Sequence, residues 1–229
     1  MKPVSELRQD IVSGDWVVIA TGRAKRPHDF LIARRIPFRQ PKNICPFEKI
    51  EEGALIFYDV KGGGNKKEWW VEAVKNKYPA FSKHGVCAMD HGAGIYRLTD
   101  GVGFHEVIVT RDHDRSIARM SDEEVELVMR IFQERYRALK KDSCVAYISI
   151  FHNHGRQSGA TITHPHSQII AIPVIPPDIG RSIQGSARFF HAQNECVHCA
   201  VIAHELREQE RIVYANEHFL VIAPYASRS

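Results

Sequence analysis

The segment THPHSQIIAIP, residues 163–173, places two histidines on either side of a proline, followed by Gln168 and an apolar run. Side chains two positions apart in a strand point to the same face, so His164 and His166 could face one site. A neutral imidazole can ligate a metal, act as a base or attack an electrophile. The two histidines by themselves leave all three chemistries open.

A polar, glycine-containing loop precedes these histidines. The stretch FHNHGRQSGAT (151–161) contains Asn153 and Thr161 together with Gly155 and Gly159. Glycines let a backbone approach a ligand closely, and N–H groups in such a loop suit phosphate oxygens. A glycine-rich loop alone is often only a turn. Its combination with four histidines and a glutamine within residues 151–168 favours a functional site.

A metal site could form around Cys45. Glu48 follows it at the position where the usual zinc motif C-x-x-C has its second cysteine, and His113 ends a strand-like run. Together with His164, these residues would offer the tetrahedral nitrogen, sulfur and oxygen ligands that zinc accepts. Spacing alone is weak evidence, because a cysteine and a histidine far apart in sequence are usually unrelated.

The other cysteines are one close pair and two isolated residues. Cys196 and Cys199 form a C-x-x-C pair, which in a reducing compartment indicates half of a metal site rather than a disulfide. Cys87 and Cys144 have no metal-site spacing around them, and we expect both to be buried thiols.

Charge and hydropathy limit the class of protein. The formal net charge of +4 permits an anionic small-molecule substrate and does not argue for nucleic acid. No stretch approaches the roughly 18 apolar residues of a membrane span, and the first residues lack the apolar core of a signal peptide. We therefore expect a cytoplasmic protein with no nucleic-acid or membrane partner. The basic cluster at Arg23 and Arg26 fits a phosphate clamp or a solvated turn equally well.

The elements that must position these residues are mostly strands. Apolar runs predict strands at residues 16–20, 56–60, 69–74, 104–110, 145–151 and 167–173. Residues 121–141 predict the one clear helix, because Ser121 and Glu124 form a capping box. This order predicts an α+β domain whose antiparallel sheet carries the helix on one face. Prolines at residues 173, 176 and 177 predict a linker over 172–180.

The residues beyond this linker repeat an earlier pattern. CPFE (45–48) precedes a strand that leads to NKYPAF (76–81), and CVHC (196–199) precedes a short helical run and RIVYANEHFLVIAP (211–224). We interpret this as an internal duplication. Residues 1–175 then form one complete domain, and residues 176–229 form a linker and an incomplete second copy.

With these motifs assembled, the chain resembles the galactose-1-phosphate uridylyltransferase family, which is built of two histidine-triad-like halves. The resemblance covers nearly the whole chain and is carried by RAKRP, NKYPAF, HEVIVTRDH, FHNHG with GATITHPHSQ, CVHC and NEHFLVIAPYASR. The GATITHPHSQ segment also resembles the related ADP-glucose phosphorylase. The implied fold is a histidine-triad-like domain, followed by the start of a duplicated copy.

The resemblance implies roles for the residues around HPHSQ. His166 matches the nucleophile that attacks the α-phosphorus of a nucleotide sugar and carries the nucleotidyl group. Gln168 matches the residue that hydrogen-bonds this phosphoryl group. His164 matches a metal ligand, as do Cys45 and His113, and the implied metal is zinc.

The remaining roles concern the substrate. Asn153, Gly159 and Thr161 fall on the phosphate-contacting loop, where Thr161 replaces a serine, and Asn76 falls on the nucleoside-contacting turn. Arg23 and Arg26 match arginines that reach a phosphate, partly across a dimer interface. The resemblance therefore implies a homodimer whose partners are a nucleotide sugar and a sugar 1-phosphate.

Two departures from the family pattern stand out. Glu48 occupies the place of the second cysteine, and the sequence ends within the second half. The expected function is transfer of a nucleoside monophosphate, with UMP as the nucleotide, as in galactose metabolism. The alternatives are a phosphorylase with inorganic phosphate as acceptor and a non-catalytic nucleotide-binding module. A purely structural zinc protein would give no reason for His166 and Gln168.

Overall fold

The structure, a computed structural model, describes residues 6–19, 40–50, 53–59, 66–83, 87–93, 95–155 and 158–227. It divides into two compact units. One unit holds residues 35–175, and the other combines the N-terminal segment up to residue 34 with residues 176–229. We call the first the sheet unit and the second the helical unit.

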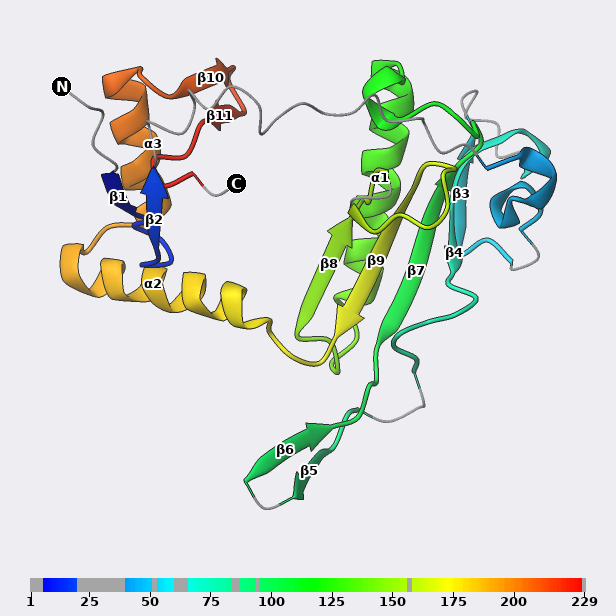
Figure 1. The fold of residues 1–229 in the computed structure, drawn as a ribbon, viewed down its shortest axis with the longest axis horizontal. Helices are drawn as coiled ribbons and strands as arrows, with labels where there is room; N and C mark the ends of the chain where they lie inside the picture. The colour runs from blue at the N-terminus through cyan, green and yellow to red at the C-terminus, as the bar shows by residue number, and fades with distance from the viewer. Residues whose placement is uncertain are drawn as a thin grey trace, which may run out of the picture. The chain divides into compact units, whose positions relative to one another are not determined.

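The sheet unit is built on one five-stranded antiparallel sheet, with the strand order β3-β4-β7-β9-β8 (Figure 1). Its elements are β3 (Ile56–Asp59), β4 (Trp69–Lys75), β5 (Asp90–Ala93), β6 (Tyr96–Thr99), β7 (Phe104–Thr110), α1 (Asp122–Leu139), β8 (Tyr147–Phe151) and β9 (His166–Ile172). Short 3₁₀ turns span Lys42–Ile44, Pro46–Glu48, Lys66–Glu68 and Ile117–Arg119. The α+β prediction, with its antiparallel sheet and one long helix, is confirmed.

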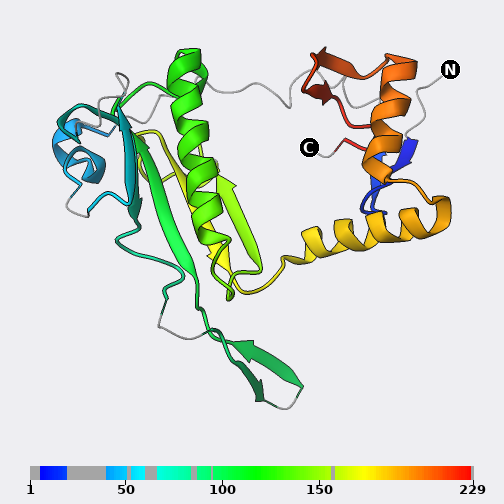
Figure 2. The ribbon, with the colours of Figure 1, turned by 180° about the vertical axis from the view of Figure 1, so that it is seen from behind.

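Helix α1 covers one face of the sheet and forms the main core with it (Figures 1 and 2). Val71, Ile108 and Ile169 point to this face from three neighbouring strands and meet Val128 and Ile131 of the helix. The helix begins at the predicted capping box: the Ser121 side chain accepts a hydrogen bond from the Glu124 backbone, and Glu124 returns one to the Ser121 N–H.

The opposite face of the sheet carries a second, smaller apolar cluster. Side chains alternate along a strand, so the neighbours of the core residues point away from α1. Val74, Val107 and Val109 lie on this face, and Phe47, Ile50 and Trp69 pack against them. The same alternation places His105 of β7 and both His166 and Gln168 of β9 on this face.

The helical unit contains two hairpins and two helices: β1 (Glu6–Gln9), β2 (Trp16–Ile19), α2 (Pro177–Gln193), α3 (Val197–Glu208), β10 (Ile212–Ala215) and β11 (Leu220–Ile222). Helix α2 approaches the β1–β2 turn closely at Gly185, where a Cβ would lie 1.8 Å from the Val12 carbonyl oxygen. In the β10–β11 turn, the Asn216 side chain accepts hydrogen bonds from the N–H groups of His218 and Phe219.

Two predictions are wrong. Part of the expected linker is helical, because Pro176 is the N-cap of α2 and Pro177 its first residue, where the missing N–H of proline costs nothing. Cys87 and Cys144 are joined in a disulfide instead of being free thiols. Sequence spacing could not show this pairing, since the two residues are 57 positions apart.

The expected second copy remains a prediction. The strand–Asn–strand pattern forms the β10–β11 hairpin. Among the helices of the described part of the chain, none is long and apolar enough to cross a membrane.

Candidate functional site

Four potential metal ligands from three segments of the chain converge at one end of the sheet unit. The ligand atoms of Cys45, His113 and His164 all lie within 4.8 Å of one another, and all three residues are buried. Glu48 joins them, with its Oε1 2.8 Å from His113 Nδ1 and 3.6 Å from His164 Nδ1. Cys45 Sγ lies 3.6 Å from His164 Nδ1. We call these four residues the ligand cluster.

Local structure explains how the cluster forms. Cys45 caps the 3₁₀ turn Pro46–Glu48, and because a 3₁₀ helix has three residues per turn, Cys45 and Glu48 project from the same side. His113 follows the end of β7, and His164 lies just before β9, the strand paired with β7. The sheet therefore brings both histidines beside the turn.

Backbone carbonyls fix the orientation of both imidazoles in the cluster. His113 Nε2–H donates to the Gln40 carbonyl at 2.8 Å, and His164 Nε2–H donates to the Thr110 carbonyl at 2.6 Å. Each ring then presents the lone pair of Nδ1 to the cluster. Such a bond at the second ring nitrogen is the usual support of a metal-bound histidine.

The donor set fits a zinc ion. A tetrahedral zinc with nitrogen and sulfur ligands holds them roughly 3.3–3.8 Å apart. The His164 Nδ1 atom lies 3.6 Å from both Cys45 Sγ and Glu48 Oε1, within this range. The His113 Nδ1 lone pair faces a carboxylate oxygen at 2.8 Å, and two acceptors at this distance need a proton or a cation between them. Burial raises the pKa of the Cys45 thiol, so a bound metal would be needed to hold it as a thiolate.

His166 is half-buried next to the cluster and has a defined tautomer. Its Nδ1–H donates to the His164 carbonyl at 2.9 Å, which leaves the Nε2 lone pair free. The Phe47 ring lies 4.9 Å from the His166 ring, between centroids. Burial lowers the pKa of His166, although the bond to the His164 carbonyl opposes this shift. His166 therefore has the properties of a neutral imidazole nucleophile.

Gln168 is positioned by His105, a residue that the sequence interpretation missed. The Ala80 N–H donates to His105 Nδ1 at 3.1 Å, so the ring proton lies on Nε2 and is donated to Gln168 Oε1 at 2.7 Å. Asn76 Nδ2 lies 3.0 Å from the same His105 nitrogen. In this tautomer both of these nitrogens carry hydrogens, so His105 contacts Asn76 but is hydrogen-bonded to Ala80 and Gln168. The sequence does indicate which face His105 occupies, because a residue two positions from Val107 points to the same face of the sheet, which also carries His166.

The described residues of the glycine loop form a turn closed by its own backbone. Gly155 and Gly159 have φ values of +77° and +85°, a backbone region that favours glycine. The N–H groups of Ser158 and Ala160 both point to the Gly155 carbonyl, so these two amides close the loop on itself. The other predicted residues, Asn153 and Thr161, lie on the same connection between β8 and β9.

The remaining predicted residues divide into two groups. Arg23 and Arg26 lie outside the described residues. Cys196 and Cys199 lie at the start of α3 and are exposed. In the described part of the chain, Cys45, His113 and His164 are the only three metal-ligating side chains that lie close enough together to hold a metal. Backbone N–H groups at the start of α3 lower the pKa of Cys196, with the N–H of Cys199 contributing most.

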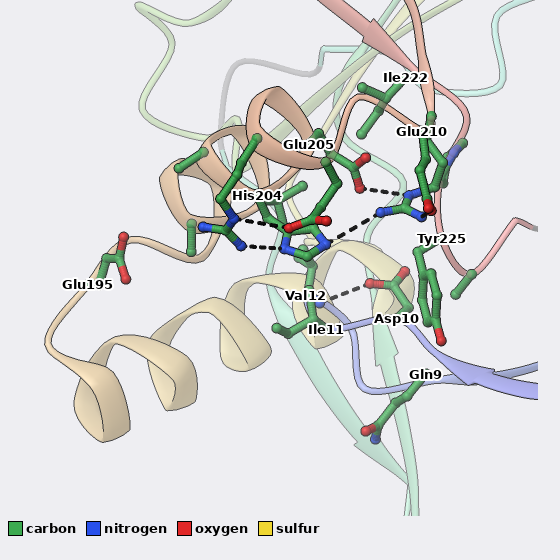
Figure 3. A pocket seen from close by; sticks show the side chains of 18 of the residues that line it. Gln9, Asp10, Ile11, Val12, Glu195, His204, Glu205, Glu210, Ile222 and Tyr225 are labelled. Carbon is green, nitrogen blue, oxygen red and sulfur yellow. Dashed lines mark hydrogen bonds and ion pairs between the residues drawn. The ribbon is translucent and has the colours of Figure 1, made fainter.

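Two cavities differ in how they relate to the predicted site residues. A cavity of about 930 Å³ in the helical unit is lined by residues such as His204, Glu205 and Tyr225 and by none of the predicted site residues (Figure 3). A smaller cavity, of about 260 Å³, is lined by Glu48 of the ligand cluster and by its neighbour Phe47.

Comparison with known proteins is consistent with this geometry. Residues 58–176, just over half of the chain, match the family described as galactose-1-phosphate uridyl transferase, N-terminal domain. The chain is 30% identical to a galactose-1-phosphate uridylyltransferase of Thermotoga maritima over 97% of its own length and 63% of the relative's. It is 28% identical to an ADP-glucose phosphorylase of Arabidopsis thaliana over 97% of its length and 62% of the relative's.

A solved structure shares the fold. The crystal structure of the Arabidopsis thaliana ADP-glucose phosphorylase with bound ADP-glucose matches with a TM-score of 0.75 and 24% identity, over 98% of this chain and 65% of that one. The chain thus spans less than two thirds of the length of these relatives. The match over residues 58–176 includes the strands that carry His105, His166 and Gln168, and the chain belongs to the galactose-1-phosphate uridyl transferase family.

Proposed function

We propose that the chain transfers a nucleoside monophosphate between a nucleotide sugar and a sugar 1-phosphate through a covalent bond to His166. The observation that carries this proposal is the hydrogen bond from His166 Nδ1–H to the His164 carbonyl. This bond directs the free Nε2 lone pair away from the backbone. Burial keeps the ring neutral at a pH where an exposed histidine would be partly protonated.

The transfer takes place in two displacements at the α-phosphorus. His166 Nε2 attacks this atom, the phosphorus–nitrogen bond forms, and the bond to the departing sugar 1-phosphate breaks. An oxygen of the acceptor sugar 1-phosphate then attacks the same phosphorus, and the phosphorus–nitrogen bond breaks. A covalent intermediate replaces one difficult displacement by two easier ones.

Gln168 stabilises the transferred group in this mechanism. Its Oε1 is occupied by the hydrogen bond from His105, so its amide N–H groups are left to donate to a phosphoryl oxygen. A donor fixed before the reaction stabilises developing charge without reorganisation. Asn76 would contact the nucleoside, and Asn153, Gly159 and Thr161 the phosphates.

We propose zinc as the metal of Cys45, Glu48, His113 and His164. When bound, it would join the 3₁₀ turn to the ends of β7 and β9 and so fix the segment from which His166 projects. The His164 carbonyl accepts a hydrogen bond from His166 Nδ1–H. The orientation of His164 as a metal ligand is therefore linked to the tautomer of His166. A second metal position at Cys196 and Cys199 and a homodimer with Arg23 and Arg26 at its interface are part of the same proposal.

A trapping experiment tests the covalent step. The chain is incubated with a nucleotide sugar radiolabelled in the α-phosphate, and protein-bound label is measured after denaturation. We expect label that is stable to base and released by acid, as a phosphorus–nitrogen bond requires, and none in His166→Ala. Equal labelling of His166→Ala would remove His166 from its assigned role.

A phosphorylase is the second candidate. The Arabidopsis thaliana ADP-glucose phosphorylase matches 97% of this chain, as fully as the uridylyltransferase from Thermotoga maritima does. The first displacement would be unchanged, and inorganic phosphate would replace the sugar 1-phosphate in the second. Adding each acceptor to the labelled protein separates the two functions. The sequence resemblance implies UMP as the transferred group, whereas this relative is named for ADP-glucose.

A further inference from the structure

The cavity of about 260 Å³ beside the ligand cluster contains a carboxyl group that the proposed mechanism does not use. Glu72 lines it and is only 3% exposed. No hydrogen bond from the described side chains or backbone reaches this carboxyl. The cavity is also lined by Phe47, Trp69 and Arg111, and the Arg111 guanidinium lies over the Trp69 ring at 5.0 Å.

Glu72 stands in one cross-strand row with His166. It is paired with Val109 of β7, and Val109 is paired in turn with His166 of β9. Directly paired residues point to the same face of a sheet, so Glu72 and His166 both lie on the face opposite α1. The row spans two strand spacings, about 9.6 Å. This is comparable with the reach from the α-phosphorus of a nucleotide to the hydrogen-bonding edge of its base.

Phe47 connects the two ends of this row. Its ring contacts the His166 ring and also lines the cavity that contains Glu72. A nucleoside extending from a phosphate at His166 would therefore pass along an aromatic surface before its base reached the carboxyl. Phe47 and Trp69 give the cavity its aromatic surface, and charged side chains form most of the rest of its lining: Glu48, Lys49, Lys66, Glu72 and Arg111.

We propose that this cavity receives the nucleobase and that Glu72 accepts a hydrogen bond from an exocyclic amino group, so that the site prefers adenine to uracil. This inference rests on the proposed function, and it replaces the uridine expected from the sequence. The amino group of adenine donates to a carboxyl oxygen. Uracil has no amino group, and the carbonyls beside its N–H turn their lone pairs toward the carboxyl oxygens.

Paired nucleotide sugars test the preference. The rate of protein labelling is measured with ADP-glucose and UDP-glucose, each labelled in the α-phosphate, for the wild-type chain, for Glu72→Gln and for the control Glu68→Gln. Glutamine keeps the shape of Glu72 but can also present its N–H₂ to uracil. We expect the wild-type chain to label at least about tenfold faster with ADP-glucose. We expect Glu72→Gln to bring the two rates within about threefold, and Glu68→Gln, an exposed change outside the cavity, to keep the wild-type ratio.

Direct binding separates this inference from the covalent mechanism. Calorimetry with ADP and UDP reports the base preference whether or not a covalent bond forms. If neither sugar labels the protein, the assignment of His166 as nucleophile is rejected. The base assignment still holds in that case if ADP binds more tightly than UDP and Glu72→Gln reduces the ratio of the two affinities. Equal or tighter binding of UDP by the wild-type chain, or a ratio unchanged in Glu72→Gln, would overturn the assignment of Glu72.

Discussion

Cys45 and Cys196 begin similar stretches of sequence, CPFE and CVHC, but their surroundings differ. Cys45 is buried and lies beside two histidines and a glutamate, whereas Cys196 and Cys199 are exposed at the start of α3. The difference arises from the sheet, because β7 and the β8–β9 connection deliver His113 and His164 to Cys45. The β10–β11 hairpin has no such neighbours among the described strands. A short motif forms a metal site only where tertiary structure supplies the other ligands.

The sheet unit and the helical unit also differ in how each pairs a buried glutamate with an arginine. Glu106 of β7 receives two hydrogen bonds from Arg135 of α1, one on each carboxylate oxygen. Glu205 of α3 receives one from Arg211, and its Oε2 is buried without a partner among the described residues (Figure 3). Glu106 thus has a hydrogen bond on each carboxylate oxygen, while Glu205 keeps one oxygen without a partner among the described residues.

The largest difference between the two cysteine motifs should appear on metal removal. We expect His113→Ala to lower zinc affinity at least about 100-fold and to reduce protein labelling by nucleotide sugar at least as much, because the His164 segment loses its anchor. Cys196→Ser should leave the zinc of the sheet unit in place. Zinc content after dialysis and labelling of each variant measure both effects. Full zinc content in His113→Ala would contradict the assignment of the ligand cluster.

The second comparison concerns the two ion pairs. Arg135→Leu leaves the Glu106 carboxylate buried without a counter-charge, and we expect it to lower the free energy of unfolding of the sheet unit by about 3–5 kcal/mol. Arg211→Leu should lower the free energy of unfolding less, since it removes one hydrogen bond to Glu205 whereas Arg135→Leu removes two to Glu106. Urea unfolding followed by the fluorescence of Trp69 and Trp70, in a Trp16→Phe background, reports the sheet unit. The exposed pair Glu126–Arg130 serves as control through Arg130→Leu. An effect of Arg135→Leu no larger than the control would show that Glu106 finds other partners.

A smaller effect is expected from His105→Phe. Without the donor at His105 Nε2, the Gln168 amide is free to rotate, and we expect about a 10- to 100-fold slower labelling step. Binding of the nucleotide should change little, because the proposed bond from Gln168 strengthens only as charge develops. Single-turnover labelling at saturating nucleotide sugar, compared with His154→Phe on the exposed loop, isolates this step. A change in affinity with an unchanged rate would assign His105 to the nucleoside instead.

The mildest test uses pH. Burial lowers the pKa of His166 below the ordinary 6.5, so the ring stays neutral as the pH falls through that value. The labelling rate should therefore reach half of its maximum below pH 6.5. The unfolded chain binds protons that His152, His164 and His166 do not bind in the folded state, so the free energy of unfolding should also fall as the pH drops below 6.5. A labelling midpoint above pH 6.5 would contradict a neutral, buried nucleophile.

Local patterns predicted much of the sheet unit. The FHEVIVT strand and the capping box of α1 occur where periodicity and capping chemistry place them. The sequence predicts one site of Cys45, Glu48, His113 and His164, and these side chains lie together in the structure. Their convergence depends on which strands pair, and no local pattern contains this information.

For other features, local sequence patterns were not sufficient. His105 lies in an ordinary strand pattern, and its contacts with Asn76 and Gln168 arise from tertiary structure. The Cys87–Cys144 disulfide likewise depends on two distant segments meeting. The linker prediction failed for a different reason, because prolines can begin a helix as readily as they end one. The cross-strand row of Glu72, Val109 and His166 depends on the strand register, which no local pattern contains.

The central claim is that His166 carries the nucleotidyl group. The most direct measurement mixes the chain with a nucleotide sugar in the absence of any acceptor and counts the sugar 1-phosphate released in the first turnover. We predict a burst of about one equivalent per active site, followed by no further release until an acceptor is added, and no burst in His166→Ala. Release that begins only when the acceptor is present would contradict a covalent intermediate and indicate direct transfer between the two substrates.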